Sequence, residues 1–560
     1  MKKMPIEKYH PYPAADLPDR RWPSRTMTAA PRWCSVDLRD GNQALIVPMG
    51  IREKSELFSL LVKMGFKEIE TGFPSASQTE LDFMRHLIEN RLIPEDVTIQ
   101  VLTQAREHLI TRTYESLRGA QKAIVHLYNS TSELQRRVVF RMDRAAIMDL
   151  AVRGAEMVRN GAERLDGTRV TYQYSPESFT GTENDFALEV CEAVLDVWEP
   201  SPENRVIINL PATVEMTTPN IYADRIEWFC RNIKKRENII LSLHAHNDRG
   251  TAVAATELAL LAGADRVEGT LFGNGERTGN VDIVTVAMNM FSQGIDPCLD
   301  FSDIDSISEV YQRCSGLPLH PRHPYAGELV YTAFSGSHQD AISKGMKSRG
   351  ADAALWEVPY LPIDPADVGR TYESIIRINS QSGKGGVAYV LEREYGLRLP
   401  KEMHVEFGAT VQRISDSTGK EVSAAMIWDA FRTEYLETGG KYSLGDCKID
   451  SKSADASGCG TSLSAVIAVS GEKHKIKGTG NGPIDAFCKA VGRERGIDIK
   501  LTAYHEHALE QGSDATAVAY VEIEDELGAR RWGAGTDPNI DRASFKAVLS
   551  ALNRTGKSRL

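Results

Sequence analysis

The sequence predicts an α/β protein: a (β/α)₈ TIM barrel, then a linker region, then a C-terminal α+β domain. Between about residues 33 and 280, short apolar or β-branched runs alternate with longer stretches of helical spacing. Polar residues able to carry chemistry follow the ends of these runs, and the composition changes at about residue 435. We therefore divide the chain into an N-terminal extension, a catalytic barrel, linker subdomains and the α+β domain, at residues 1–32, 33–325, 326–434 and 435–560.

Eight short runs are the predicted strands of the barrel. Eight βα repeats need about 250 residues in a closed barrel, which is the length available here. An open doubly wound sheet is the alternative, and periodicity by itself does not distinguish the two. The runs are Trp33–Leu38, Lys67–Gly72, Val97–Leu102, Ala123–Leu127, Val170–Tyr174, Val206–Leu210, Ile239–Leu243 and Arg266–Leu271.

The placement of reactive residues favours the barrel over the open sheet. In a closed barrel the C-terminal ends of all eight strands open on one face, so residues that follow different runs meet there. Reactive side chains stand at or just after the ends of the first, fourth, fifth, sixth and seventh runs: Asp37, Arg39, Asp40, His126, Ser175, Glu177, Thr213, His244 and His246.

Composition excludes several classes of protein. With 42% hydrophobic and 26% charged residues, the chain is typical of folded globular proteins. Its formal net charge of −11 argues against nucleic acid or an anionic membrane as a partner, because both attract basic surfaces. No apolar stretch approaches the roughly 20 residues of a membrane-spanning helix. We expect no nucleic-acid or membrane partner.

The N-terminus and the cysteines indicate a cytoplasmic protein. Lys2 and Lys3 are followed by five prolines and no apolar segment, so no secretory signal is expected. The eight cysteines are scattered without a C-x-x-C pair, which argues against a zinc ribbon or a disulfide framework.

The segment LSLHAHNDRG holds the densest group of candidate metal ligands. On an extended strand, residues two apart point the same way, so His244 and His246 can face one ion. A carboxylate completes such a site, and Asp40 reaches it because strands one, eight and seven are neighbours in a closed barrel. Asn280 in GERTGN is the fourth candidate. The alternatives are a structural histidine pair and an Asp40 that caps a helix or forms a salt bridge.

Several motifs resemble one family of acyl-CoA condensing enzymes. They are LRDGNQ, TGFPSASQTE, YSPESFTGTE, LPATVE, HAHNDRGTAVA and FGNGERTGN, with GTGNGPIDAF and HALEQGSDATAVAYVE near the C-terminus. The chain resembles the group of 2-isopropylmalate, homocitrate and citramalate synthases over nearly its whole length. It is most similar to the long form of the 2-isopropylmalate synthase family, in which the last domain binds leucine and regulates the enzyme.

The resemblance implies roles for individual residues. The metal ligands are Asp40, His244 and His246, with Asn280 close to the ion. The substrate-binding residues are Leu102, His126, Ser175 and Thr213. The catalytic residues are Arg39, Glu177, His338 and Tyr372, of which the last two come from the linker and reach an active site, that of the partner subunit in a homodimer.

The implied reaction is a Claisen-type condensation of acetyl-CoA with 2-oxoisovalerate, the first committed step of leucine biosynthesis. A divalent metal is expected, Mg²⁺ first, with Mn²⁺ or Zn²⁺ as alternatives and K⁺ as an activating monovalent cation. Arg39 is expected to stabilise the developing alkoxide. The base that takes a proton from acetyl-CoA is either Glu177 or His338, and the residues do not decide between them.

Leucine is the expected inhibitor. In GNGPIDA, backbone groups are placed to hold the charged ends of an amino acid, as in the leucine site of the family. We assign Asn481, Pro483, Ile484 and Tyr504 to this site. A second H-x-H pair, His505 and His507, is read as surface or packing.

Three other functions compete with this assignment. Homocitrate synthase would need an additional cation near Leu102 for the second carboxylate of 2-oxoglutarate. Citramalate synthase remains open, because the methyl group of pyruvate also fits an apolar pocket. A non-catalytic sensor of metal and leucine is disfavoured, because it would not need Arg39, Glu177, His338 and Tyr372.

Overall fold

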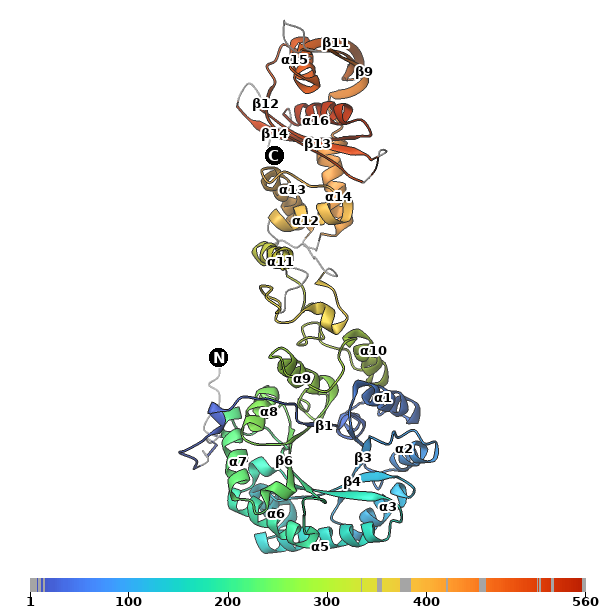
Figure 1. Ribbon diagram of the computed structural model, residues 1–560, viewed down its shortest axis with the longest axis vertical. Helices are drawn as coiled ribbons and strands as arrows, with labels where there is room; N and C mark the ends of the chain where they lie inside the picture. Colours follow the sequence, from blue (N-terminus) through green and yellow to red (C-terminus); the bar gives the residue numbers. More distant parts are fainter. Residues whose placement is uncertain are drawn as a thin grey trace. The chain divides into compact units, whose positions relative to one another are not determined.

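The computed structural model describes residues 8, 12–13, 16–333, 335–349, 355–372, 384–418, 422–452, 460–510, 512, 515–524 and 528–555. The chain forms two compact units, one of residues 1–330 with 363–371 and one of residues 331–362 with 372–560 (Figure 1). Among the described helices, none has the length and apolar character needed to cross a bilayer.

The first unit is the predicted (β/α)₈ barrel. Eight parallel strands pair in chain order, and β1 closes the barrel against β8. The strands are β1 Arg32–Ser35, β2 Glu68–Gly72, β3 Thr98–Gln104, β4 Lys122–Ser130, β5 Arg169–Glu177, β6 Val206–Ala212, β7 Ile239–Ala245 and β8 Arg266–Gly269. All positions of β6 and β7 are buried, as expected of strands covered on both faces.

Helices surround the barrel (Figure 1). In α1, Leu57, Phe58, Leu61 and Met64 are buried at helical spacing. The helices of this unit are α1 Ile51–Met64, α2 Gln78–Glu89, α3 Glu107–Leu117, α4 Glu133–Gln135, α5 Arg144–Glu163, α6 Asn184–Trp198, α7 Pro219–Asn232, α8 Ala252–Leu261, α9 Ile283–Phe291 and α10 Ile304–Ser315.

Seven of the eight predicted strand ends differ from the structure, and the second strand alone ends as predicted, at Gly72. The first strand stops at Ser35, and residues 37–41 form a π-helical turn, because the carbonyl of Val36 accepts the N–H groups of Arg39, Asp40 and Gly41. The fourth strand extends to Ser130 through its pairing with β5, so His126 lies in its middle and does not close it. The fifth strand extends to Glu177 and so includes Ser175 and Glu177.

The second unit combines helices with two antiparallel sheets (Figure 1). One sheet has the order β11-β10-β9 and the other β12-β13-β14. The strands are β9 Tyr442–Lys452, β10 Gly460–Val469, β11 Glu472–Gly480, β12 Lys500–Ala508, β13 Ala517–Glu524 and β14 Arg530–Asp537. The helices are α11 Gly336–Ser348, α12 Lys384–Tyr395, α13 Met403–Thr418, α14 Ala424–Phe431, α15 Pro483–Arg495 and α16 Ile540–Thr555.

The predicted α+β domain corresponds to the two sheets with α15 and α16. The helix α15 packs on β11, α16 packs on β14 and β13, and the rings of Phe487 and Phe545 stack with centroids 4.3 Å apart. Apolar side chains from both sheets and both helices form one buried core. The closing helix was predicted from Arg542 to Leu552 and is longer at both ends.

Candidate active site

The π-helical turn after β1 presents Arg39 and Asp40 at the C-terminal end of the barrel strands. Asp37, which begins this turn, accepts hydrogen bonds from Leu271 N at 3.0 Å and from Ser35 Oγ at 2.7 Å. Since Leu271 follows β8, the closure of the barrel fixes the turn. Asp37 therefore acts as an anchor and does not pair with Arg39.

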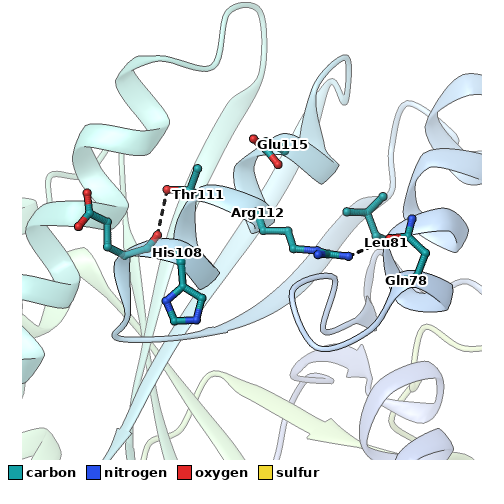
Figure 2. Close-up of a pocket in the computed structure, with 7 residues that line it drawn as sticks. Gln78, Leu81, His108, Thr111, Arg112 and Glu115 are labelled. Atoms are coloured by element: carbon teal, nitrogen blue, oxygen red, sulfur yellow. Dashed lines mark hydrogen bonds between the residues drawn. The ribbon is translucent and has the colours of Figure 1, made fainter.

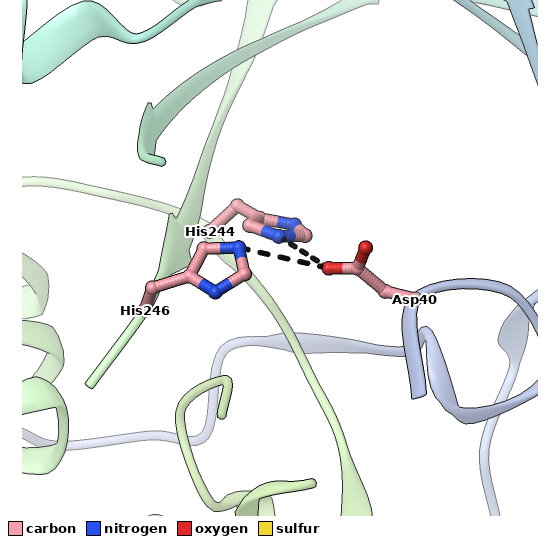
Figure 3. Close-up of side chains that lie close together, drawn as sticks. All are labelled: Asp40, His244 and His246. Carbon is pink, nitrogen blue, oxygen red and sulfur yellow. Dashed lines mark hydrogen bonds and ion pairs between the residues drawn. The ribbon is translucent and has the colours of Figure 1, made fainter. Parts of the chain in front are cut away.

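Asp40, His244 and His246 converge on one point (Figure 3). Asp40 Oδ2 lies 3.0 Å from His244 Nε2 and 3.8 Å from His246 Nε2. One donor atom from each residue lies within 4.8 Å of the others, and all three side chains are buried. Among the described residues this is the one His, Cys, Asp and Glu group with that geometry.

A second carboxylate orients His244 from behind. Glu268 Oε2 lies 2.9 Å from His244 Nδ1, so the proton of the neutral ring is held on Nδ1 and Nε2 is directed to the site. The other oxygen of Glu268 accepts from Arg266 and Gln173 at 2.6 Å and from Gln100 at 3.1 Å. Sequence reasoning missed Glu268, although a charged residue in the middle of a barrel strand was a usable signal.

The charges around Asp40 keep it ionised. Burial favours its neutral form, but Arg39 and the two histidines outweigh burial and hold the pKa of Asp40 well below its usual range. Burial also disfavours the charged form of His244, yet hydrogen bonds to Asp40 and Glu268 raise its pKa to about 9. Burial and the neighbouring His244 lower the pKa of His246 to about 4.

Asn280 lies against the same group. Its Nδ2 donates to Asp40 Oδ2 at 2.7 Å and lies 3.2 Å from His244 Nε2. Its Oδ1 is buried with no hydrogen-bond partner and points toward Gly275, where a Cβ would come within 1.8 Å. Rotation of the amide by 180° would present Oδ1 to the centre of the group, so Asn280 can supply an oxygen ligand.

These donors fit a divalent cation. An ionised carboxylate, two imidazole nitrogens and an amide oxygen are the ligand types that Mg²⁺, Mn²⁺ and Zn²⁺ accept. Among the described residues, neither Asn280 Oδ1 nor His246 Nδ1 has a hydrogen-bond partner, although both atoms are buried. The buried Glu268 behind His244 is the type of outer carboxylate that orients metal-binding histidines.

A cavity of about 380 Å³ opens beside this group. It is large enough for a small organic acid and lies at the face where barrel enzymes carry out chemistry. Its lining includes nine residues of the predicted set, which are Arg39, Asp40, Leu102, His126, Ser175, Glu177, Thr213, His244 and His246. The cavity is also lined by Phe73, Tyr128, Asn209, Pro211, Glu276 and Arg277, which sequence reasoning did not identify.

Arg39 is held by two carboxylates. Its Nη1 lies 2.5 Å from Asp40 Oδ1, and its Nη2 lies 2.8 Å from Glu70 Oε2. Burial disfavours the charged guanidinium, but Asp40 and Glu70 outweigh it and raise the pKa of Arg39 well above its usual range. The guanidinium is therefore a permanent positive charge at the wall of the cavity.

His126 and Ser175 form a buried polar wall. His126 Nε2 lies 2.7 Å from Ser175 Oγ, which also accepts from Asn209 Nδ2 at 3.0 Å. On its other side His126 Nδ1 lies 3.5 Å from Glu70 Oε1. Ser175 is therefore part of β5 and of this hydrogen-bond network, and it does not shape a turn.

Glu177 and Thr213 meet at the ends of β5 and β6. Ser130 Oγ donates a hydrogen bond to Glu177 Oε2, and Thr213 Oγ1 accepts one from Ser178 N at 2.9 Å. The backbone N–H of Thr131 donates to the carbonyl of Glu177 at 3.1 Å. Ser130 at the end of β4 therefore contacts the carboxylate of Glu177, while Thr131 and Thr213 hold the backbone of Glu177 and Ser178.

His338 and Tyr372 belong to the second unit. His338 lies on α11, where its exposed ring stacks on Tyr360 with centroids 4.0 Å apart. Tyr372 is half-buried. Their predicted participation in an active site stays a prediction.

The predicted effector residues also lie in the second unit. Pro483 begins α15, and Asn481 N donates to Asp485 Oδ2 at 2.8 Å across this helix start. Ile484 and Tyr504 are half-buried and pack against the same apolar core, and Tyr504 Oη lies 3.0 Å from Ser544 Oγ. The leucine-binding role of the four residues stays a prediction.

A larger hollow, of about 690 Å³, lies on the outside of the barrel between α2 and α3 (Figure 2). Its lining residues come from these two helices, and Arg112 Nη2 donates to Gln78 Oε1 at 3.0 Å. It contains none of the predicted site residues. The smaller cavity beside Asp40 is therefore the candidate active site.

Three family models and several relatives match nearly the whole chain. Residues 30–310 match a family described as HMGL-like, residues 328–392 match the alpha-isopropylmalate synthase post-catalytic domain, and residues 421–556 match the LeuA allosteric (dimerisation) domain. A 2-isopropylmalate synthase of Parafrankia sp. is 60% identical over 99% of this chain and 98% of its own length. Enzymes of the same name from Rhodospirillum rubrum and Clostridium acetobutylicum are 58% and 57% identical, over 98% and 99% of this chain and 98% and 100% of their own lengths.

Proposed function

We infer the chemistry of this site from one premise: the chain belongs to the 2-isopropylmalate synthase family. It is an acyltransferase that condenses acetyl-CoA with 2-oxoisovalerate and water to give 2-isopropylmalate and CoA. The product is the first committed intermediate on the way to leucine. The observation that carries this function to the residues is the buried group of Asp40, His244 and His246 beside an open cavity.

Asp40, His244 and His246 would hold a divalent cation, with Asn280 as the fourth protein ligand. Mg²⁺ is the proposed metal, Mn²⁺ and Zn²⁺ are the alternatives, and K⁺ is a further activator. When bound, the cation would polarise the keto group of the acceptor as a Lewis acid. The ionised state of Asp40 and the Glu268 contact of His244 prepare these atoms for that task.

Arg39 stabilises the charge that develops during condensation. Carbon–carbon bond formation turns the keto oxygen of the acceptor into an alkoxide, and a fixed cation at the cavity wall favours that change. The side chain of Arg39 is only 10% exposed and is tethered by Glu70, so little reorganisation accompanies the reaction. The polar wall of His126, Ser175 and Thr213 is the proposed binding surface for the carboxylate of the 2-oxo acid.

Two residues remain candidates for the base. Removal of a methyl proton from acetyl-CoA needs a group within hydrogen-bond reach of that carbon's proton. Glu177 lines the cavity and is oriented by Ser130. His338 is the alternative, and with Tyr372 it would also position the water that hydrolyses the thioester of the condensed intermediate. His338 and Tyr372 would come from the partner subunit of a homodimer.

An apolar patch determines which 2-oxo acid fits. Leu102, Phe73 and Pro211 contribute apolar side chains to the lining of the cavity. The isopropyl group of 2-oxoisovalerate fills such a patch, while the methyl group of pyruvate would lose about 1–3 kcal/mol of contact per missing methylene or two.

The second unit would make the enzyme sensitive to its end product. We assign leucine binding to the start of α15 and the middle of β12, where Asn481, Pro483, Ile484 and Tyr504 lie. The match to an allosteric dimerisation domain supports both leucine binding and a homodimer.

The seven described cysteines are free thiols, which suits a reducing compartment such as the cytoplasm.

A thiol-release assay on the full chain tests the proposal. Acetyl-CoA is offered with 2-oxoisovalerate, pyruvate or 2-oxoglutarate, before and after treatment with a chelator. We expect the highest kcat/KM with 2-oxoisovalerate, loss of turnover with chelator, and recovery when Mg²⁺ is returned. A preference for pyruvate would indicate a citramalate synthase, and no thiol release with any acceptor would leave a non-catalytic sensor.

A further inference from the structure

The loop that follows Glu177 is held in an unfavourable backbone conformation. Residues 178–183 connect β5 to α6, and Ser178 has a φ of 59°, in the left-handed region that side-chain-bearing residues avoid. Thr213 Oγ1 accepts the N–H of Ser178, and Thr182 Oγ1 donates to its carbonyl at 3.0 Å. Such a conformation persists only where the surroundings restrain it from several sides.

A single buried arginine supplies the largest restraint. Arg225, on α7, is 4% exposed. Its Nη2 donates to the carbonyls of Phe179 at 2.9 Å and Thr182 at 2.6 Å, and its Nη1 donates to the carbonyl of Thr180 at 2.8 Å. Its Nε donates to Asn184 Oδ1 at 2.7 Å. The guanidinium of Arg225 therefore binds three carbonyls of the loop, those of residues 179, 180 and 182, and the side chain of the first residue of α6.

The fifth donor of this guanidinium reaches the N-terminal extension. Arg225 Nη1 also donates to Tyr12 Oη, which in turn donates to the carbonyl of Thr180 at 2.5 Å. All five N–H groups of Arg225 thus have acceptors, and in the described part of the chain these acceptors are neutral oxygens. A lysine, with three donors on a flexible stem, cannot reproduce this arrangement.

The N-terminal segment is fixed to the same helix beside Arg225. Trp22 Nε1 donates to Asp224 Oδ1 at 2.7 Å, and Arg20 Nη2 lies 2.7 Å from Asp224 Oδ2. This brings Tyr12, 213 residues away in sequence, to the active-site loop. The extension therefore contributes a contact to the catalytic barrel.

We propose that Arg225, completed by Tyr12, is a positioning residue for Glu177. By holding the carbonyls of residues 179, 180 and 182, Arg225 keeps Ser178 in its left-handed conformation and so keeps the Glu177 carboxylate directed into the cavity. The proposal rests on the proposed function, in which Glu177 lies at the reacting centre. It adds a specific route by which a side chain outside the cavity controls turnover.

Steady-state kinetics of Arg225→Lys test the proposal. Misplacement of a reacting group by about 1 Å costs on the order of 100-fold in rate, so we expect kcat to fall about 10- to 100-fold. KM for the 2-oxo acid should stay within about twofold, because the acceptor contacts are unchanged. Arg231→Lys is the matched control: Arg231 lies on the same helix and binds Asp19 and Glu227. Its kcat should match that of the wild type.

A double-mutant cycle separates action through Glu177 from a general effect. In a Glu177→Gln background, Arg225→Lys should cause no further loss of kcat beyond about twofold. Losses that multiply would overturn the proposal. If Glu177→Gln has wild-type kcat, the proposed role of Glu177 at the reacting centre is contradicted, and the inference that rests on it is contradicted as well. If Glu177→Gln is impaired while Arg225→Lys is not, this inference alone fails.

Hydrogen exchange gives a readout that does not depend on activity. Amides of residues 178–184 should exchange at least tenfold faster in Arg225→Lys than in the wild type and in Arg231→Lys. If Arg225→Lys fails to fold, Tyr12→Phe is the second variant. It removes the Tyr12 hydroxyl, which donates to the carbonyl of Thr180 and accepts from Arg225. It should lower kcat about two- to tenfold and speed exchange in the same loop, and unchanged exchange in Tyr12→Phe would contradict the proposal.

Discussion

The interiors of the barrel and of the C-terminal α+β domain (the module) are built from different kinds of side chain. Inside the barrel, Arg266, Glu268 and Glu70 are fully buried and charged. In the module, the core is a cluster of apolar side chains centred on the stacked rings of Phe487 and Phe545. Burying ions costs several kcal/mol per charge unless each is paired, whereas burying apolar surface stabilises directly.

The buried charges of the barrel cost stability, and they orient the side chains of the candidate active site. Glu268 is satisfied by Arg266 and glutamine amides, and its remaining oxygen orients His244. An apolar barrel core would be at least as stable but would leave the imidazole without a fixed tautomer. The module contains none of the proposed metal ligands, so no buried charge is needed there to orient one.

The largest expected effect comes from removing the imidazole that both carboxylates contact. His244→Ala should lower kcat at least about 1,000-fold, because one of the three proposed metal ligands is lost. The barrel should remain folded, with a lower melting temperature, because Glu268 is left with one unpaired oxygen. Thiol release and circular dichroism measure the two effects. His86→Ala on α2 is the control, and full activity in metal-stripped wild type would exclude the metal role.

Glu268→Gln should have a smaller effect than His244→Ala, because it keeps the imidazole and changes only the carboxylate behind it. Replacing the outer carboxylate removes the partner that fixes the His244 tautomer, so metal affinity should fall about 10- to 100-fold. Titration calorimetry with Mn²⁺ measures the change. Glu257→Gln, on the outer helix α8, serves as the control. Unaltered affinity in Glu268→Gln would mean that the buried charge serves packing alone.

In the module, loss of apolar contact should affect leucine and leave catalysis intact. Ile484→Ala should raise the half-inhibitory leucine concentration about tenfold, the equivalent of about 1.4 kcal/mol, with kcat in the absence of leucine unchanged. Ile499→Ala removes the same atoms from another half-buried position on this core. Equal shifts in both variants would place the effector elsewhere.

The smallest effect concerns the pH dependence of barrel stability. Burial raises the pKa of Asp37 from 3.8 to about 7, with hydrogen bonds from Ser35 and Leu271 only partly opposing it. Between these two values the folded state keeps a proton that the unfolded state has lost, so the free energy of unfolding falls as pH rises. Asp37→Asn removes this term. From pH 5 to 7 the wild type should lose about 2–4 °C of melting temperature per pH unit relative to the variant. Parallel melting curves for the two proteins would contradict the assigned pKa.

Much of the site could be predicted because local patterns were sufficient. His244 and His246 are two residues apart on a strand, and strand order alone brings Asp40 to them. Arg39, Ser175, Glu177 and Thr213 follow strands or lie near their ends, and a barrel gathers such residues on one face. The convergence of Asp40 with the histidine pair is confirmed by the distances between their atoms.

Other parts depended on pairings that no short segment reveals. Glu70 and Glu268 appear as ordinary charges in the sequence, and their roles follow from contacts with Arg39 and His244. Residues 37 and 38 of the π-helical turn were predicted as the end of a strand, because the carbonyl of Val36 that closes the turn gives no compositional signal.

The sequence by itself determined the barrel, the C-terminal α+β domain and the residue types of the candidate metal site, because hydrophobic periodicity and the positions of reactive residues near successive strand ends can be read along the chain. Only the tertiary structure decided which charges are buried together, which protonation states they adopt and how Tyr12 and Arg225 meet at the loop after Glu177. Those outcomes depend on desolvation and on distances between residues remote in the chain, and both exist only once the chain has folded.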